Sequence, residues 1–279
     1  MNMIIEAGGT KTNIVFTDSG KIIDSYTEDG FNLSRETKEE FEKRLIRWRE
    51  FGKENPQSVH LFAAGKLNEP KHKEFIDLIQ QILECKQANI YSDLLAACYA
   101  TAGNNKGIVA ILGTGSNSCY YNGKEIEKNI SPGGFILGDE GSGAHIGKKI
   151  LLAFLRNELP DQLRKQLEQE FHLTNELIIQ NVYGGTVRSA ALYFSSFATF
   201  VNSRLHDESC RNLCSSSIEE FLDLIEKNYL SHSNQLYLVG SVAYHLRDLI
   251  KIKAKQRNIE IIKLIQHPIT ELSLFLADK

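Results

Sequence analysis

One sequence pattern occurs twice in this chain: a short apolar strand, a turn containing Gly and Thr, and a second strand. In the first copy Met3–Ile5 leads into Glu6–Thr12, which reads EAGGTKT, and in the second Ile108–Leu112 leads into Gly113–Asn117, which reads GTGSN. In a glycine turn the backbone N–H groups can close around an oxyanion, and a neighbouring Thr hydroxyl adds a further donor. The repeat therefore predicts an α/β fold with two lobes that hold one polyphosphate from opposite sides.

The first turn has to be distinguished from a P-loop, because Lys11-Thr12 follows two glycines. A P-loop requires the pattern G-x-x-x-x-G-K-[ST] at the start of a helix. Here Thr10 separates Gly9 from Lys11, and the residues that follow have the pattern of a strand. A plain hairpin would explain one such turn, but the second copy favours phosphate binding. The candidate nucleotide contacts in the two turns are Gly8, Gly9, Thr10, Lys11, Thr12, Gly113, Thr114 and Gly115.

Composition and charge argue against several classes of partner. Of the 279 residues, 42% are hydrophobic and 24% are charged, as expected for a soluble globular protein. The net charge of −3 gives no basic footprint for nucleic acid, and no apolar run is long enough to span a bilayer. The five cysteines are scattered and odd in number, and the N-terminus lacks the pattern of a cleaved signal. We therefore expect a cytoplasmic protein with reduced thiols that binds neither nucleic acid nor membrane.

The order of predicted elements supports a duplication. In each half, three short strands are followed by helices that alternate with further strands. The polar, glycine-rich Gly103–Gly107 predicts the boundary between an N-terminal lobe over residues 1–106 and a C-terminal lobe over 107–279. The last helix, from Ile269, is free to pack back on the N-terminal lobe. Further helices are predicted from about Thr186 to Arg204, over Ile218–Tyr229, and for roughly four turns after Gly240-Ser241.

Ser92-Asp93 lies between a predicted strand and a predicted helix. Ser and Asp at such a position commonly serve as helix N-caps. The carboxyl end of a strand is also where α/β proteins place their catalytic groups. Phosphoryl transfer to an alcohol uses a carboxylate that accepts the hydroxyl proton. Position alone leaves both interpretations of Asp93 open.

The segment Gly133–Gly143, which reads GGFILGDEGSG, combines many glycines with two acidic residues. A flexible loop with a capping Asp or Ser would explain part of this composition. However, carboxylates held in a tight glycine turn suit a polyol, whose neighbouring hydroxyls can donate paired hydrogen bonds to them. The segment therefore supplies candidate substrate contacts, which are Gly133, Gly134, Asp139 and Glu140.

A predicted buried strand ends in Gly240-Ser241 at the start of a helix. Taken alone, a simple strand–helix turn explains this pattern better than ligand binding does. The alternative is a contact with adenosine, because glycine permits the close approach of a flat base or ribose. Gly184, before a predicted long helix, could form the opposite wall, and a loop breaker explains it at least as well.

Together these motifs resemble the N-acetylglucosamine kinase-like branch of the BadF/BadG/BcrA/BcrD ATPase family, within the actin-like and sugar-kinase superfamily. The resemblance covers nearly the whole chain in the family's order, and it is most specific at Gly138–Gly143 (GDEGSG). The other matching motifs are Glu6–Thr12, Gly30–Asn32, Phe62–Gly65, Ser92-Asp93, Gly113–Asn117, Gly240–Tyr244 and Pro268-Ile269.

The resemblance implies two ribonuclease H-like lobes with an interlobe cleft that closes over Mg-ATP and an amino sugar. Asp93 would be the base that activates the sugar 6-hydroxyl, and Glu6, where the family usually has Asp, would serve Mg²⁺. Thr10 and Thr114 would contact phosphates. The implied sugar contacts are Asn32, Ser116, Asn117, Gly133, Gly134, Asp139 and Glu140, and the implied nucleotide contacts outside the two turns are Gly184, Gly240 and Ser241.

The leading hypothesis is an ATP- and Mg²⁺-dependent kinase of N-acetylglucosamine or a related amino sugar. One alternative is a dehydratase-activating ATPase of the same family, which needs cysteines that bridge an iron–sulfur cluster between subunits. The sequence supplies no clear set of such cysteines. The other alternative is a non-catalytic sugar or nucleotide sensor. The sequence does not choose between N-acetylglucosamine, N-acetylmuramic acid and plain hexoses, and it leaves a homodimer open.

Overall fold

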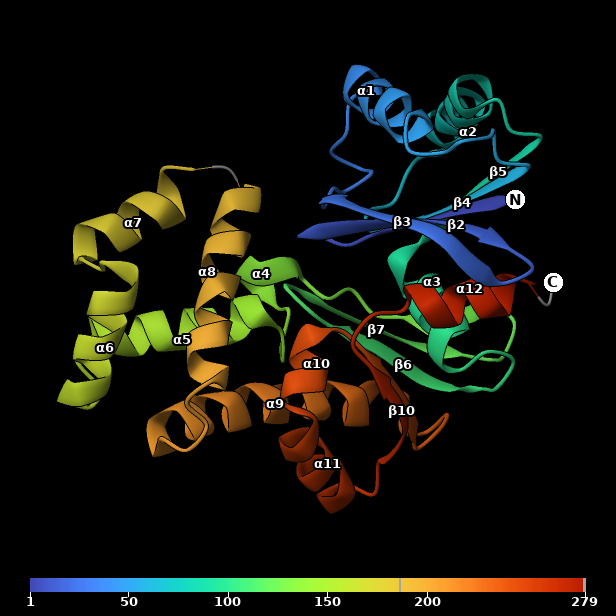
Figure 1. The fold of residues 1–279 in the computed structure, drawn as a ribbon. Coiled ribbons are helices and arrows are strands. Elements are labelled where there is room, and N and C mark those ends of the chain that lie inside the picture. The colour runs from blue at the N-terminus through green and yellow to red at the C-terminus, as the bar shows by residue number, and fades with distance from the viewer. Residues whose placement is uncertain (186, 278–279) are drawn as a thin grey trace. The chain divides into compact units, whose positions relative to one another are not determined.

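Two five-stranded sheets organise the chain, one in each of two structural units (Figure 1). The computed structural model describes residues 1–185 and 187–277. The first unit comprises Met1–Asn105, Asn122–Ile126 and the described residues from His267 onward, and the second comprises Lys106–Tyr121 and Glu127–Gln266. The α/β class predicted from the repeated pattern is confirmed.

The sheet of the first unit has the strand order β3-β2-β1-β4-β5. Its strands are β1 (Asn2–Ala7), β2 (Lys11–Asp18), β3 (Lys21–Asp29), β4 (Ser58–Ala63) and β5 (Gln87–Ser92). The first three form an antiparallel meander, whereas β4 runs parallel to β1 and β5 runs parallel to β4. The first glycine turn therefore connects β1 to β2, and Asp93 follows β5 at the edge of the sheet where the parallel strands end.

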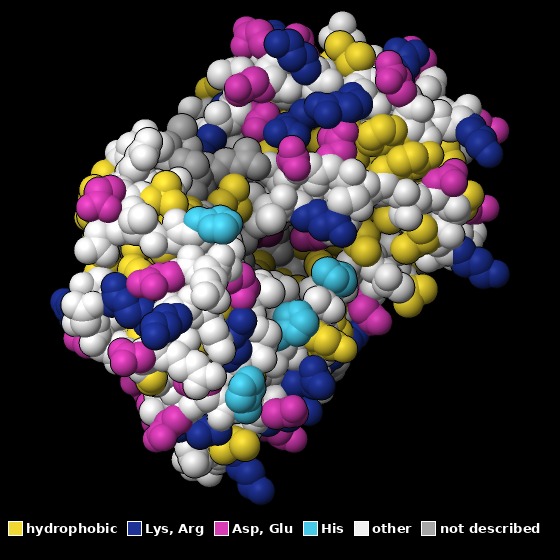
Figure 2. Space-filling model, turned by 60° about the vertical axis from the view of Figure 1, so that its left-hand side comes forward, with side chains coloured by type: hydrophobic (Ala, Val, Ile, Leu, Met, Phe, Trp, Pro, Cys, Tyr) yellow, Lys and Arg dark blue, Asp and Glu magenta, His cyan; other side chains and the backbone are white. Residues whose placement is uncertain are grey.

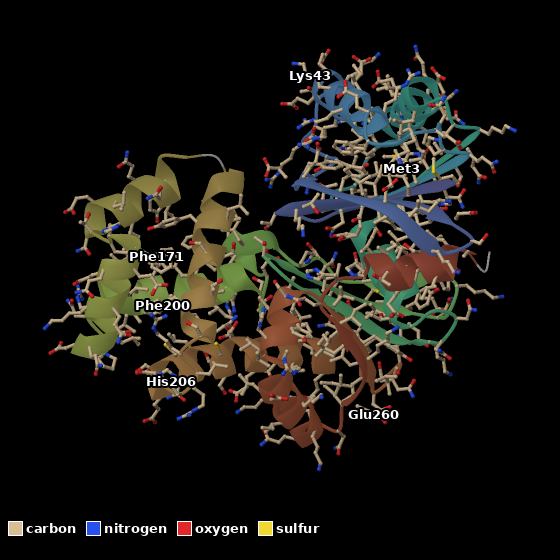
Figure 3. The ribbon with its side chains drawn as sticks, in the orientation of Figure 1. Met3, Lys43, Phe171, Phe200, His206 and Glu260 are labelled. Atoms are coloured by element: carbon tan, nitrogen blue, oxygen red, sulfur yellow. The ribbon has the colours of Figure 1, made fainter. Side chains whose placement is uncertain are left out.

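Helices cover both faces of this sheet, with α1 and α2 on one face and α3 and α12 on the other (Figure 1). They are α1 (Lys38–Arg49), α2 (Glu69–Leu83), α3 (Asp93–Thr101) and α12 (Ile269–Ala277). Phe41, Leu45 and Trp48 form the apolar stripe of α1, and they are buried in the same core as Met3 of β1 (Figure 3). The meander that carries the first turn is therefore packed against this core.

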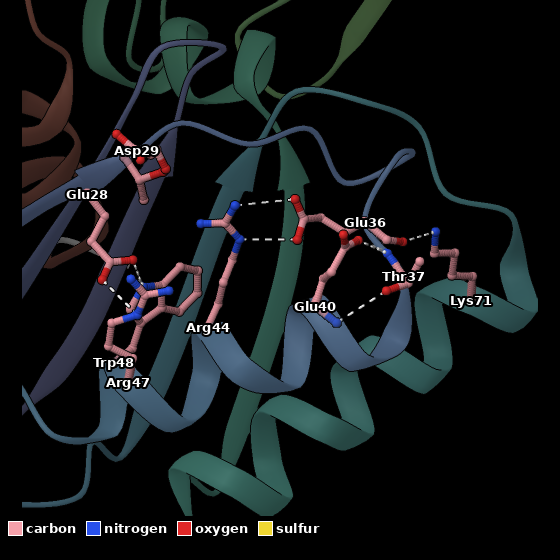
Figure 4. Close-up of polar contacts among 10 residues, drawn as sticks. Glu28, Asp29, Glu36, Thr37, Glu40, Arg44, Arg47, Trp48 and Lys71 are labelled. Carbon is pink, nitrogen blue, oxygen red and sulfur yellow. Dashed lines mark hydrogen bonds and ion pairs between the residues drawn. The ribbon is translucent and has the colours of Figure 1, made fainter. Parts of the chain in front are cut away.

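Polar contacts fix both ends of the segment between β3 and α1 (Figure 4). Trp48 Nε1 donates to Glu28 Oε2 at 2.8 Å, and Arg47 Nε lies 3.2 Å from Glu28 Oε1. Thr37 and Glu40 form a capping box at the start of α1, in which each side chain accepts from the other's backbone N–H. The nearly buried Glu28 carboxylate is thus paired twice, as a buried charge requires.

The sheet of the second unit repeats the first, with the strand order β10-β9-β6-β7-β8. Its strands are β6 (Gly107–Leu112), β7 (Ser116–Tyr121), β8 (Ile126–Asn129), β9 (Gln235–Val239) and β10 (Glu260–Ile265). β6 pairs antiparallel with β7 and parallel with β9, as β1 does with β2 and β4. The second glycine turn therefore connects β6 to β7, in the place that the first turn has in its own sheet.

Helices form most of the rest of the second unit. They are α4 (Gly134–Leu137), α5 (Gly143–Leu155), α6 (Asp161–Phe171), α7 (Asn175–Tyr183), α8 (Val187–Asn202), α9 (Glu208–Tyr229), α10 (Ser241–His245) and α11 (Arg247–Gln256). Phe171 at the end of α6 meets Phe200 of α8 in an edge-on contact with ring centroids 6.1 Å apart (Figure 3). Phe197 adds a second contact with Phe171 at 4.4 Å, so aromatic packing joins α6 to α8.

The helix predicted over Ile218–Tyr229 proves longer, because α9 begins at Glu208. The side chain of Asp207 caps it by accepting from the Cys210 N–H at 3.2 Å. Cys210 and Cys214 are buried on the face that also carries Ile218. The serines between these residues have low helix propensity, so the start of the helix does not stand out in the sequence.

One other helix prediction needs correction. The residues after Gly240 form α10 and α11 rather than one helix of four turns, because the buried Leu246 between them leaves the helical conformation at φ −96° and ψ 13°. The short α4 had no signal in the sequence. The predicted long helix is α8, and its predicted first residue, Thr186, lies outside the described residues.

The face of the molecule drawn in Figure 2 shows mixed charge. On the face drawn in Figure 2, Lys and Arg side chains are interspersed with Asp and Glu rather than gathered into one basic field. Across residues 1–185 and 187–277, no helix combines the length and the apolar character that crossing a bilayer requires.

Candidate functional site

The first glycine turn is tied together by its own backbone and by Gly30. The Gly8 N–H donates to Lys11 O at 2.9 Å, and the Gly30 N–H donates to Thr10 O at 2.9 Å. A Cβ atom on Gly30 would lie only 2.3 Å from Gly8 O, so no larger residue fits there. Gly9, Thr10 and Lys11 are exposed at the tip of this turn. The predicted phosphate contacts are therefore presented by a closely packed backbone.

Thr12, also predicted to contact phosphate, has a structural role. Its side chain is buried, and its Oγ1 donates to the backbone oxygen of Asp29 at 3.0 Å. This bond crosses from β2 to β3 and fixes the base of the turn.

Two carboxylates lie at the edge of the first sheet where β1 and β5 end. Glu6 pairs in register with Asn13 across β1 and β2, and Asn13 Nδ2 donates to Glu6 Oε2 at 2.9 Å. Ser92 caps α3 by accepting from the Leu95 N–H at 3.1 Å, which leaves Asp93 as the first residue of the helix. The capping function that the sequence left open for both residues therefore belongs to Ser92.

The two carboxyl groups share a poorly solvated environment. Both residues are half-buried. Burial raises the pKa of Asp93, and the backbone N–H of Leu94, which donates to Asp93 Oδ1 at 2.8 Å, acts in the opposite direction. Burial also raises the pKa of Glu6, and the nearby Asp93 charge raises it further, while Asn13 and Lys11 lower it. Such a pair favours either a proton or a bound cation.

Asn32 is held against the strand end that carries Ala64 and Gly65. It forms a bridge with Ala64, and a Cβ on Gly65 would lie 2.3 Å from Asn32 Oδ1. The same Oδ1 accepts from the backbone N–H of Ser34 at 3.0 Å and from its hydroxyl at 2.6 Å. The structure thus brings together two of the motifs, Gly30–Asn32 and Phe62–Gly65, that the sequence identified separately.

The second glycine turn is joined by backbone hydrogen bonds to the loop that precedes α5. The Gly113 N–H donates to Gly115 O at 2.9 Å. From the start of α5, the Gly143 N–H donates to Gly113 O at 2.8 Å and the Ala144 N–H donates to Thr114 O at 3.0 Å. The segment with the sequence GDEGSG is therefore part of the same site as the turn.

Asp139 lies where this loop meets the turn. Its residue is only 8% exposed and has a left-handed backbone, with φ 59°. A Cβ on Gly115 would lie 2.8 Å from Asp139 Oδ2, and the Ser116 backbone N–H hydrogen-bonds the carboxylate. The pKa of Asp139 is raised to about 6, chiefly by burial and in smaller part by the neighbouring Glu140, while the Ser116 bond and the Lys148 ammonium act in the opposite direction.

Several predicted substrate contacts surround one small hollow. It is lined by Ser116, Asn117, Ser118, Ile130, Pro132, Glu140, Phe221 and Leu224. Gly133 and Gly134 both have left-handed backbones, with φ 74° and 69°, and a Cβ on Gly133 would lie 3.1 Å from Gly138 N. The Asp139 N–H donates to Pro132 O at 2.9 Å. These contacts fold residues 132–139 back on themselves beside the hollow.

Of the two predicted adenosine motifs, the structure brings one to the second turn. Gly240 has φ 123°, and a Cβ there would lie 2.2 Å from Leu112 O, directly before the turn. Ser241 is exposed as the first residue of α10. The contacts described for Gly184 stay within α7, where its N–H donates to Gln180 O at 2.8 Å.

Sequence reasoning missed three polar residues of the site. Asn13 could have been found from its register with Glu6 in the predicted hairpin. Lys148 had no spacing signal, although its Nζ donates to Phe135 O and its charge acts on Asp139. His145 had none either: its Nδ1 lies 2.8 Å from Ser217 Oγ and accepts from the Gly141 N–H at 3.4 Å, which ties the acidic loop to α9.

The sequence pattern of the BadF/BadG/BcrA/BcrD ATPase family matches residues 5–269. The chain belongs to this family. An N-acetylmuramic acid/N-acetylglucosamine kinase of Clostridium acetobutylicum is 30% identical over 162 residues, which are 55% of this chain and 53% of the relative. The match thus spans about half the length of that curated relative.

Solved structures of related proteins show the same fold. A Porphyromonas gingivalis protein, provisionally named an N-acetylglucosamine kinase, is 29% identical and superimposes with a TM-score of 0.93 over 100% of this chain and 99% of its own. A ROK family glucokinase from Streptomyces griseus, solved with glucose and AMPPNP, is 14% identical and gives a TM-score of 0.60 over 99% of this chain and 97% of its own. The second likeness concerns the fold alone.

Proposed function

We propose that this protein is an ATP-dependent kinase that transfers the γ-phosphoryl group to the 6-hydroxyl of N-acetylglucosamine or a related amino sugar. The observation that carries the proposal is the Asp93 carboxylate, which follows β5, is not used as a helix cap and lies beside Glu6. The match to the P. gingivalis protein along the whole chain supports the substrate class. A related kinase from C. acetobutylicum is named for the same class of sugar.

In the proposed reaction, the sugar oxygen attacks the γ-phosphorus, the bond from that phosphorus to the β,γ-bridging oxygen breaks, and ADP leaves. Asp93 accepts the hydroxyl proton. Its raised pKa makes its ionised form a stronger base than an exposed aspartate. The N–H groups of the two glycine turns, with Thr10 and Thr114, hold the phosphates. Asn32, Asn117 and Asp139 orient the sugar.

The residues at the end of β1 fit a magnesium ion. Mg²⁺ in such enzymes is held by one or two carboxylates together with substrate phosphates. Glu6 offers one carboxylate, which Asn13 orients and which the neighbouring Asp93 makes more attractive to a cation. In the described part of the chain, no three His, Cys, Asp or Glu side chains gather into a metal site of their own. When bound, the ion would neutralise phosphate charge, and Glu6 is the residue that would hold it.

We expect Glu6→Gln to raise the Mg²⁺ concentration needed for half-maximal activity by about tenfold, because it removes the charge that attracts the ion. Glutamine keeps an oxygen that can accept from Asn13, so the position of the side chain is preserved. The measurement is a Mg²⁺ titration of ADP release at saturating sugar. An unchanged titration would show that Glu6 does not serve the metal.

The cysteines do not favour the dehydratase-activating alternative. All five are buried free thiols. A cluster shared between subunits requires thiolates that reach the surface, and burial raises the pKa of Cys210 to about 11 and that of Cys214 to about 12.

The test of the proposed function is an ADP-release assay with Mg-ATP and a panel of sugars. N-acetylglucosamine, N-acetylmuramic acid and glucose would define the substrate, and 6-deoxy-N-acetylglucosamine is the matched control. We expect turnover with at least one amino sugar, none with the 6-deoxy compound, and a product whose phosphorus couples to the C6 protons by NMR. Sugar binding in calorimetry without ADP release would instead establish the sensor.

A further inference from the structure

Two asparagine side chains meet at the end of β7, next to the hollow that contains Glu140. Asn129, the last residue of β8, donates from Nδ2 to Asn117 Oδ1 at 3.0 Å. The same Nδ2 reaches two backbone oxygens, those of Ser118 at 2.8 Å and Ile130 at 3.2 Å. All these groups belong to the second unit.

Backbone partners fix which end of each amide faces which way. The Ser118 N–H lies 2.9 Å from the Asn117 side chain and can only donate, so the atom that it meets must be Oδ1. The Ser118 and Ile130 carbonyls can only accept, so the Asn129 atom that they meet must be Nδ2. Exchanging O and N in either side chain would break these bonds, and the orientation therefore follows from the fold.

A buried tyrosine holds the same corner from α9. Tyr229, at 0% exposure, donates from its hydroxyl to Ser118 O at 2.8 Å and accepts from the Ile130 N–H at 3.1 Å. The two backbone segments that meet Asn129 are thus pinned to each other independently of it. Loss of the Asn129 side chain should therefore leave Asn117 Oδ1 held by the Ser118 N–H alone, without unfolding the corner.

This arrangement leaves one polar end of Asn117 for a ligand. Its Oδ1 is engaged twice, and its Nδ2 donates to no residue in the part of the chain that the structure describes. Asn117 and Glu140 line the same hollow, which therefore offers an amide donor and a carboxylate acceptor. A hydroxyl group both accepts and donates, so it satisfies the two together.

We propose that Asn129 is a positioning residue. It holds Asn117 so that Asn117 Nδ2 donates a hydrogen bond to a sugar hydroxyl, and that hydroxyl donates in turn to the Glu140 carboxylate. The inference rests on the proposed sugar-kinase function and assigns a role to a residue outside the motifs. Asn129 itself does not touch the substrate. Its effect is confined to the sugar, because the nucleotide is assigned to other residues.

The test compares Asn129→Ala with Asn117→Ala and with the double variant. We expect each single variant to raise the KM for the sugar, and its Kd in calorimetry, by about tenfold, which is the effect of losing one hydrogen bond. The KM for ATP should not change. The double variant should resemble Asn117→Ala, because both substitutions remove the same oriented donor. Asn234→Ala is the matched control, since that amide lies at a turn and donates to Asn258 O at 3.4 Å.

Two results would overturn the inference: a normal sugar KM in Asn129→Ala, or fully additive effects in the double variant. Asn129→Ser provides a second test if the alanine variant is poorly folded, because its hydroxyl can still donate to a nearby carbonyl but is too short to hold Asn117. If the wild-type protein binds none of the sugars in calorimetry, the proposed function fails first. If the wild type binds sugar and Asn129→Ala binds it equally well, only the role of Asn129 is wrong.

Discussion

Replacing Asp93 by Asn should lower kcat for sugar phosphorylation by about 10³-fold, within the range for loss of a general base. Asparagine cannot accept the hydroxyl proton. Its Oδ1 can still accept from the Leu94 N–H, and Ser92 still caps α3, so the helix should remain in place. ATP and sugar affinities, measured by calorimetry, should stay within a few fold of wild type.

The pH dependence gives a second readout of the same role. The base works when ionised, and its pKa is raised in the folded protein, so kcat should decline as the pH falls through that raised pKa. The residual activity of the Asn variant should lack this decline. Asp161→Asn is the matched control, because Asp161 is the exposed first residue of α6 as Asp93 is the first residue of α3. Near-normal turnover in Asp93→Asn would assign the base to another residue.

Local pattern was sufficient to predict the strands and turns that carry the site. The apolar runs Met3–Ile5 and Ile108–Leu112 and the glycines after them predict two hairpins, and each sheet has its hairpin in the same place. This works because a turn and its strands depend on neighbouring residues. For the same reason, the glycines and acidic residues around Asp139 were sufficient to predict a substrate-binding loop without knowledge of its contact with Gly115.

Contacts between distant segments could not be predicted in this way. His145 meets Ser217 across 72 positions, and Tyr229 meets Ser118 across 111. Neither pair has a spacing that a sequence can reveal, since tertiary packing alone brings the helices to the sheet. The sequence also could not show whether Ser92 or Asp93 caps α3. Both side chains can cap a helix, and only hydrogen-bond geometry shows which one does.

Asp139→Asn should stabilise the protein at pH 8 while weakening sugar binding. The pKa of Asp139 is raised from 3.8 to about 6 in the folded protein, which means that folding favours the neutral form. Below pH 3.8 this preference makes its full contribution to the free energy of unfolding, and the contribution is lost as the pH rises through 6. At pH 8 the ionised carboxylate therefore costs up to about 3 kcal/mol relative to a neutral group. Asparagine avoids this cost and tolerates the left-handed backbone.

The net gain should be smaller, about 1 to 2 kcal/mol, because the amide does not reproduce every contact of the carboxyl group. Denaturation midpoints of both proteins at pH 4 and pH 8 would measure it, and the gain should shrink toward zero at pH 4. The exposed Asp161→Asn control should shift stability by less than about 0.5 kcal/mol at either pH. A buried carboxylate that lowers the stability of the folded protein in this way is expected where the carboxylate binds substrate. If Asp139→Asn were less stable than wild type at pH 8, the carboxylate would instead be a structural partner of Lys148.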